Sequence, residues 1–147
     1  MPQSLVKILV HIVFSTKNRV DLIHPEIESE LYGYIHGIVA NNNAKLITAN
    51  GTQNHSHFLV SMGRNDVSVL IGDMKRSTSL WIKKQGPADF YWQKGYGAFS
   101  IGQSQVPAVV KYIKDQKDHH AAQSYEDEFR ALCGKYGVEI DERYCWD

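Results

Sequence analysis

The hydrophobic positions of the chain change their period along its length, and these changes predict where strands and helices lie. Residues 5–14 are almost continuously apolar and β-branched, which predicts a buried central strand. Two further strands are expected at residues 45–49 and 53–62, joined as an antiparallel hairpin because Asn50-Gly51 is a strong turn signal. The aromatic, glycine-punctuated residues 90–101 predict a fourth strand with a bend or bulge.

Apolar residues that recur every three or four positions predict the helices. These helices are expected at about residues 25–40, 66–84, 104–119 and 124–136. Pro25 stands in the first turn of the first helix, where a missing backbone N–H costs little. Gly86-Pro87 ends the second helix.

The element order is therefore strand, helix, strand, strand, helix, strand, followed by further helices. This order is that of the split β-α-β, ferredoxin-like or RRM-like plan of the α+β class. Such a plan has an antiparallel sheet with helices on one face and leaves the other face open to hold a ligand. We expect a single domain over residues 1–147, with its core at about 5–120, an added helix after the fourth strand and an acidic C-terminal extension at 121–147.

The formal net charge of the 147 residues is zero, which hides an uneven distribution. Residues 1–117 contain 13 basic and 8 acidic residues, whereas residues 118–147 contain 3 and 8. Residues 75–117 alone contain 8 basic and 2 acidic ones, so this stretch can attract a polyanion, although ordinary surface lysines would give the same count. The candidate phosphate contacts are Lys17, Arg19, Lys75, Arg76, Lys83 and Lys84.

The sequence gives no sign of export or membrane insertion. Met1 is not followed by a positively charged start and a long apolar stretch, and no apolar run approaches the ~20 residues of a membrane span. Cys133 and Cys145 form neither a disulfide framework nor a CxxC pattern. We expect a cytoplasmic protein with reduced thiols.

The third expected strand contains the pair His55-Ser56-His57. Because a strand alternates its faces with a period of two, both imidazoles leave the same face, one pleat apart. That spacing suits a shared metal ion, since imidazole is a common metal ligand. A catalytic metal needs at least one more ligand and an open position for substrate, so the pair alone is incomplete.

The third expected helix contains Tyr112 and Gln116 one turn apart, so they share a face. This face points about 100° away from the apolar stripe of the helix, and the two side chains therefore flank the core instead of filling it. The Gln116 oxygen can bind a hard or borderline cation, and Tyr112 would lie beside that cation. A tyrosine nucleophile next to a metal suits a phosphodiester, because the metal neutralises charge that develops on the phosphate.

Several segments, in this order, resemble the single-tyrosine HUH transposases of the smallest insertion sequences. They are residues 13–17 (VFSTK), 55–57 (HSH), 92–100 (WQKGYGAFS) and 112–116 (YIKDQ), followed by His119-His120. The resemblance implies that His55, His57 and Gln116 hold Mg or Mn and that Tyr112 is the nucleophile. It also implies a transposase that cleaves and rejoins single-stranded DNA at hairpin-marked element ends. The implied intermediate is a 5′-phosphotyrosine, and the implied assembly is a homodimer with composite active sites.

Other functions are compatible with some of these residues. A domesticated relative would bind single-stranded or hairpin nucleic acid without strand transfer, and a relative tied to chromosomal palindromic repeats would share every motif. Two imidazoles alone would favour zinc, as in a zinc hydrolase or a cupin-like enzyme. A cupin, however, needs many short strands and further ligands, and the long helical stretches argue against it.

Overall fold

The computed structural model describes residues 2–146 and confirms the predicted α+β architecture. Within these residues, four antiparallel strands form one open sheet in the order β2-β3-β1-β4. The strands are β1 (Ile8–Ser15), β2 (Lys45–Gly51), β3 (His55–Met62) and β4 (Gly97–Ile101). The helices are α1 (Pro25–Asn41), α2 (Val67–Gln85), α3 (Val106–Lys114), α4 (Gln116–Ala122) and α5 (Tyr125–Lys135), with 3-10 turns at Lys17–Arg19 and Gln103–Gln105.

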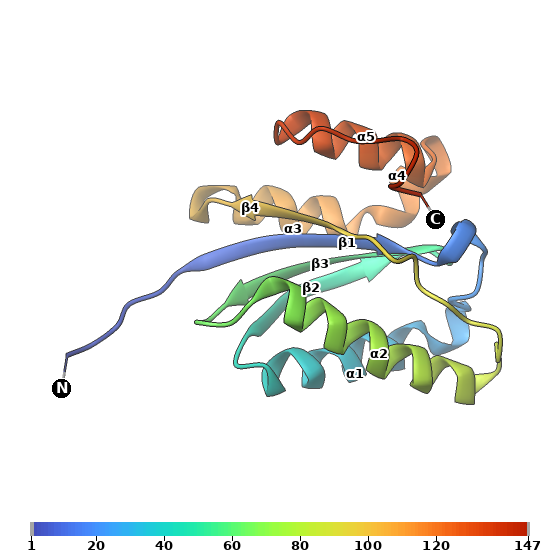
Figure 1. Cartoon of the computed structure of the whole chain (residues 1–147), viewed down its shortest axis with the longest axis horizontal. Helices are drawn as coiled ribbons and strands as arrows, with labels where there is room; N and C mark the ends of the chain where they lie inside the picture. The colour runs from blue at the N-terminus through green and yellow to red at the C-terminus, as the bar shows by residue number, and fades with distance from the viewer. Residues whose placement is uncertain (1, 147) are drawn as a thin grey trace.

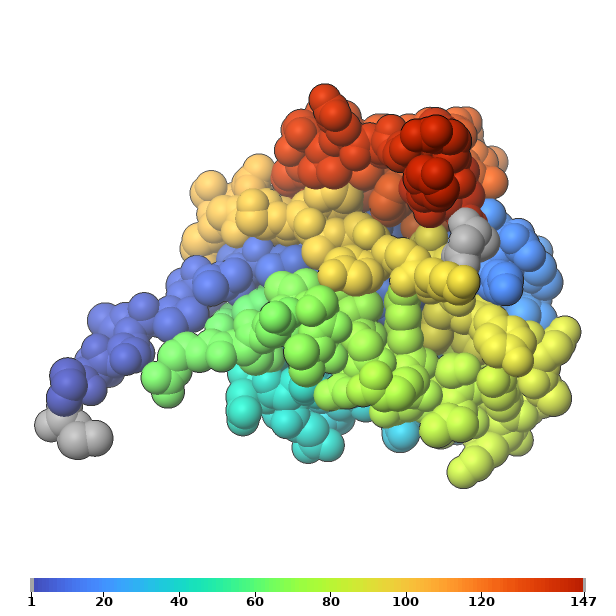
Figure 2. Space-filling model, viewed as in Figure 1, coloured from blue at the N-terminus to red at the C-terminus, as the bar shows by residue number. Residues whose placement is uncertain are grey.

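Helices lie on both faces of the sheet. In Figure 1, α1 and α2 lie below the strands, and α3, α4 and α5 lie above them. The space-filling view shows the same C-terminal segment, in orange and red, as the upper layer of the molecule (Figure 2). We predicted that one face of the sheet would be open to hold a ligand, but the chain's own C-terminal helices cover that face. In the described part of the chain, no helix has the length and apolar character that a membrane span requires.

Strand β1 supplies side chains to both layers because the faces of a strand alternate. Val10, Ile12 and Phe14 belong to the core that packs against α1 and α2. Leu9 and Val13 point to the other face, where they pack with residues of α3 and α5. Strands β1 and β3 are each paired on both sides, so the side chains they carry are held by the centre of the sheet.

The hairpin between β2 and β3 forms as predicted, but its turn lies elsewhere. Asn50 and Gly51 continue β2 and pair with His57 and Ser56, and residues 52–54 make the reversal. A Cβ on Gly51 would lie 2.2 Å from the carbonyl oxygen of His55, so glycine serves the close approach of two backbones. The prediction that Asn50-Gly51 forms the turn is therefore wrong, because both residues are paired within β2.

The fourth strand is shorter than predicted and lies at an edge of the sheet. Of residues 90–101, only Gly97–Ile101 form β4, and Trp92 makes an isolated bridge to Thr16. Phe90 and Trp92 are buried in the core on the side of α1 and α2. Phe90 and Trp92 therefore serve core packing, whereas Tyr91 and Tyr96 are exposed and Phe99 lies in the paired strand.

The predicted helix at residues 104–119 is divided in two. Helix α3 ends at Lys114 and α4 begins at Gln116, with Asp115 at φ −91° and ψ 15° between them. Asn50 Nδ2 donates to the carbonyl oxygens of Ile113, at 3.1 Å, and Lys114, at 3.0 Å. Strand β2 thus satisfies carbonyls that the end of α3 leaves without helical partners. Tyr112 and Gln116 lie on either side of this fixed break.

Candidate active site

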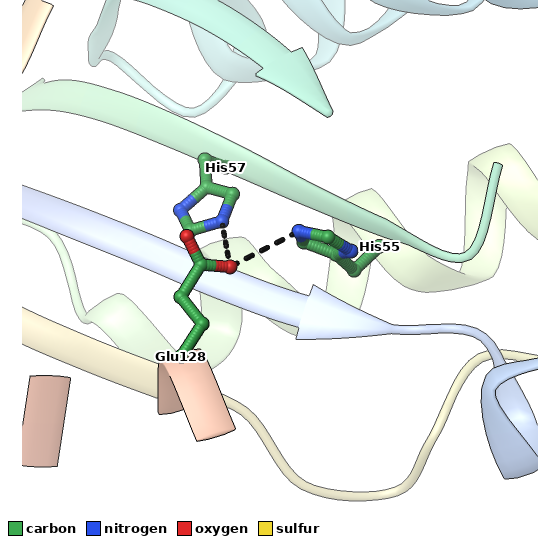
Figure 3. Close-up of side chains that lie close together, drawn as sticks. All are labelled: His55, His57 and Glu128. Atoms are coloured by element: carbon green, nitrogen blue, oxygen red, sulfur yellow. Dashed lines mark hydrogen bonds and ion pairs between the residues drawn. The ribbon is translucent and has the colours of Figure 1, made fainter. Parts of the chain in front are cut away.

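A buried polar cluster lies between the sheet and the C-terminal helices. His55 and His57 come from β3, Gln116 from the start of α4 and Glu128 from α5. The first three have no exposed surface, and Glu128 is 4% exposed. Figure 3 shows the Glu128 carboxylate pointing at both imidazoles. Polar groups buried this deeply need well-matched partners, because each one left unpaired destabilises the fold.

The Glu128 carboxylate is the centre of the cluster. Its Oε1 lies 3.2 Å from Nε2 of His55 and 3.2 Å from Nε2 of His57. Its Oε2 accepts hydrogen bonds from Gln116 Nε2, at 2.9 Å, and from the Tyr112 hydroxyl. Gln116 Oε1 lies 3.0 Å from His55 Nε2. One side chain therefore joins all the residues that the sequence singled out for catalysis.

The second ring nitrogen of each histidine faces a fixed partner. His55 Nδ1 lies 2.8 Å from Asn54 Oδ1 and 3.0 Å from Thr52 Oγ1. His57 Nδ1 lies 2.8 Å from His11 Nε2. Because an amide oxygen can only accept a hydrogen bond, the Asn54 contact favours the Nδ1–H tautomer of His55, and Nε2 is the nitrogen that faces Gln116 and Glu128. Metal-binding imidazoles are oriented by outer hydrogen bonds of this kind.

His11, in the middle of β1, extends this arrangement. Burial, together with the neighbouring His57, lowers the pKa of His11 to about 3, so its imidazole is neutral and can accept a hydrogen bond. Burial also lowers the pKa of His57. Neutral imidazoles are the forms that bind a metal, and a His57 that presents Nε2 to an ion would donate its Nδ1 proton to His11.

Tyr112 lies at the border of the cluster and is partly buried. Burial raises the pKa of its phenol, and the neighbouring Glu128 carboxylate raises it further. The His119 ring stacks on the Tyr112 ring with 4.7 Å between centroids. A cavity of about 360 Å³ between α3 and α5 opens beside Tyr112 and Glu128. The phenol is thus held in one orientation next to a space that other groups can enter.

Four of the six basic residues proposed as phosphate contacts lie apart from this cluster. Lys75, Arg76, Lys83 and Lys84 belong to α2, on the opposite side of the sheet from the C-terminal helices (Figure 1). Lys75 donates to the carbonyls of residues 93–95 at 2.7 to 3.2 Å, which fixes the loop before β4.

The other two, Lys17 and Arg19, lie in the turn after β1, whose last residue pairs with His55. Arg19 donates to the Trp146 carbonyl. DNA contacts by these six residues stay a prediction.

Glu128 was not identified as a site residue from the sequence, although the helix at 124–136 that contains it was predicted. A signal was present in the helical period. Helix α5 buries Tyr125, Phe129 and Leu132 along one stripe, and Glu128 occupies the same stripe. An acidic residue within an apolar stripe indicates a buried partner, but the sequence does not say which one.

Comparison with known proteins gives a family match and two similar structures. Residues 4–116 match the family described as "Transposase IS200 like". The fold is similar to that of a candidate transposase from Deinococcus radiodurans R1, with a TM-score of 0.63 and 15% identity over 79% of this chain and 95% of that chain. It is also similar to a REP-associated tyrosine transposase bound to a REP hairpin, with a TM-score of 0.63 and 15% identity over 82% of this chain and 73% of that chain. No curated protein sequence is a significant match. At this identity the structural similarity concerns the fold alone.

Proposed function

The chain belongs to the IS200-like transposase family, and from this membership we propose that it cleaves and rejoins single-stranded DNA at hairpin-marked ends with Tyr112 as the nucleophile. The observation that carries the proposal is the joining of the Tyr112 hydroxyl, both strand histidines and Gln116 through one buried cluster. The REP-associated transposase of similar fold is bound to a hairpin, which supports a hairpin substrate here.

The donor set fits a divalent cation, which we infer to be Mg²⁺ or Mn²⁺. His55 and His57 would hold it through Nε2, and Gln116 would hold it through Oε1. When bound, such an ion would polarise a phosphate oxygen and favour the ionised form of a nearby phenol. The amide oxygen and the oxygens of a DNA phosphate favour a harder ion than zinc.

In the proposed reaction, the Tyr112 oxygen gives up its proton and forms a bond to phosphorus. The bond from phosphorus to the 3′ oxygen breaks, and that oxygen takes up a proton. The products are a 5′-phosphotyrosine and a free 3′-hydroxyl, so the energy of the ester bond is conserved for rejoining. The stacked ring of His119 and the Glu128 oxygen that accepts the phenol hydrogen bond orient the nucleophile. Burial of the cluster limits the access of water, which would otherwise compete for the phosphotyrosine.

A nicking assay separates this function from nucleic-acid binding alone. A single-stranded hairpin oligonucleotide, labelled at both ends, should be cut once by the protein with Mg²⁺ or Mn²⁺. With EDTA, cleavage should stop, because the phosphate charge would no longer be neutralised. Hairpin binding without any cleavage would favour the non-enzymatic alternative, and cleavage unchanged by EDTA would contradict the metal assignment.

The homodimer with composite sites, which the family resemblance implies, is part of the proposal. In it, Tyr112 would leave the cluster of its own chain and serve the histidines of the second chain. Strand β4 lies at a sheet edge, and an edge strand offers backbone groups that a second chain can pair with. Mixing His57→Ala protein with Tyr112→Phe protein under subunit exchange should restore cleavage at one site per heterodimer. A monomer by light scattering, or no complementation in a verified heterodimer, would instead assign the reaction to the site assembled within one chain.

His11 should act as a positioning residue for the metal site. His11→Leu removes the acceptor at 2.8 Å from His57 Nδ1, and we expect metal affinity to fall about 10–100-fold. His11→Gln should retain more affinity, because a glutamine oxygen can replace the imidazole nitrogen as acceptor. Calorimetric titration with Mn²⁺ measures both variants. Wild-type affinity in His11→Leu would remove the positioning role.

A further inference from the structure

Glu128 lies outside the part of the chain that matches the transposase family, which ends at residue 116. It nevertheless reaches the centre of the site from α5, a helix of the acidic C-terminal extension. Its neighbours along the helix stripe, Tyr125, Phe129 and Leu132, are buried and apolar. An ionised carboxylate in such a stripe costs several kcal/mol unless a cation or strong donors compensate for the lost hydration.

The two oxygens of Glu128 have different partners. Oε2 accepts from the Tyr112 hydroxyl and from Gln116 Nε2 at 2.9 Å, and these donors favour the charged carboxylate. Oε1 faces Nε2 of His55 and Nε2 of His57, each at 3.2 Å. Tyr112 and Gln116 thus satisfy Oε2 with two hydrogen bonds. Oε1 faces only the two histidine nitrogens, and its role depends on what lies between these three atoms.

Two side-chain oxygens converge on one nitrogen of His55. Gln116 Oε1 lies 3.0 Å from His55 Nε2, and Glu128 Oε1 lies 3.2 Å from the same nitrogen. On the other side of the ring, Nδ1 lies 2.8 Å from Asn54 Oδ1, so Asn54 occupies that nitrogen and Nε2 is the one that faces the cluster. A divalent cation placed among Nε2 and the two oxygens would be attracted by all three atoms.

We propose that Glu128 is itself a ligand of the divalent cation through Oε1, together with His55, His57 and Gln116; the inference rests on the metal site of the proposed function. Among the described residues, the ligand atoms of His55, His57 and Glu128 lie within 4.8 Å of one another, which is close enough to share one ion. Oε2 keeps its hydrogen bond from Tyr112, so a single carboxylate ties the nucleophile to the metal site.

The additional donor changes which ion the site suits. Zinc held by four protein ligands forms a closed tetrahedral site with no position for substrate. An octahedral ion such as Mg²⁺ or Mn²⁺ held by the same four donors retains two positions, which a phosphate oxygen and water can take. The carboxylate charge also means that the site should bind its cation before DNA brings phosphate oxygens.

Mn²⁺ binding to the full chain without DNA, measured by isothermal titration calorimetry, tests the proposal. Asp127→Asn is the matched control. Asp127 is the neighbour of Glu128 in the chain and pairs with Arg130 at the surface, so this substitution removes the same charge outside the cluster. We expect Glu128→Gln to weaken Mn²⁺ binding by about tenfold or more. Asp127→Asn should bind as the wild type does, and His57→Ala should lose binding.

The rise in Tm that Mn²⁺ causes gives a second readout, since an ion that binds the folded state stabilises it. The rise should be smaller for Glu128→Gln than for Asp127→Asn. Glu128→Asp addresses the case in which the glutamine variant does not fold. It keeps the charge but shortens the side chain by one methylene, so it should fold by circular dichroism and bind Mn²⁺ more weakly than the wild type.

The outcomes separate this inference from the function on which it rests. If Glu128→Gln and Glu128→Asp bind Mn²⁺ as tightly as the wild type, or more tightly, while His57→Ala loses binding, Glu128 is not a ligand of the cation. If His57→Ala also binds as the wild type does, the metal assignment of the proposed function fails as well.

Discussion

Tyr112→Phe should abolish strand cleavage and covalent attachment to DNA while hairpin binding stays essentially unchanged. The phenol oxygen is the only atom that the substitution removes, and no other group in the proposed reaction can form the phosphotyrosine bond. We expect the cleavage rate to fall by at least about 10³-fold, as is typical when a nucleophile is removed. Gel analysis of a labelled hairpin oligonucleotide measures cleavage and attachment, and a filter assay measures binding.

The same substitution removes the hydrogen bond from Tyr112 to Glu128, so it should also affect stability. A hydrogen bond to a charged group contributes roughly 1.5–3 kcal/mol, which leaves the variant folded. Tyr96→Phe is the matched control, because Tyr96 is 40% exposed. It should cleave like the wild type. Residual cleavage by Tyr112→Phe at the wild-type rate would contradict the assignment of the nucleophile.

His57→Ala should reduce cleavage to the level seen with EDTA, and His55→Ala should do the same. Each change removes one of the imidazole nitrogens proposed to hold the cation, and a phosphodiester without that charge compensation is a poor electrophile. Gln116→Ala should be milder, because water can replace a neutral oxygen ligand. Cleavage rates of the three variants across a Mn²⁺ titration establish this order.

The histidine variants also need a stability control, since both residues are fully buried. His57→Ala leaves His11 and Glu128 each without one partner, at a cost of roughly 1–3 kcal/mol, against a total of about 5–15 kcal/mol for a typical domain. His36→Ala, at an exposed position of α1, is the matched control and should leave cleavage intact. Normal cleavage by both histidine variants with Mg²⁺ or Mn²⁺ would overturn the proposed metal site.

The sequence was most informative for elements whose buried side chains repeat with the period of a strand or a helix. The β-branched run that became β1, the hairpin between β2 and β3, and the apolar stripe of α2 were predictable because burial imposes periods of 2 and 3.6. The common facing of His55 and His57 followed from the same alternation, and both side chains lie on the face covered by α3–α5.

The remaining features depend on contacts between distant segments. The break at Asp115 is stabilised by Asn50 of β2, and no signal within 104–119 required it. The place of Gly51 is set by the approach of the His55 backbone. Glu128 reaches the histidines only because Phe129 and Leu132 dock α5 on Val13 and Phe99. Contacts between distant segments leave no periodic pattern in the sequence. For this reason, neither the covering of the sheet by α3–α5 nor the place of Glu128 in the site was predicted.

The most direct test of the central claim is to trap and map the covalent intermediate. A single-stranded hairpin oligonucleotide in which sulfur replaces the 3′ bridging oxygen of the scissile phosphate releases a 3′-thiol on cleavage. This thiol is a poor nucleophile toward phosphorus, so the protein should remain attached to the 5′ phosphate. After proteolysis, mass spectrometry should find the nucleotide on the peptide that contains Tyr112, with Mg²⁺ or Mn²⁺ and not with EDTA. An adduct on Tyr96 or Tyr125, or no adduct on a substrate that is bound and cut, would contradict the account.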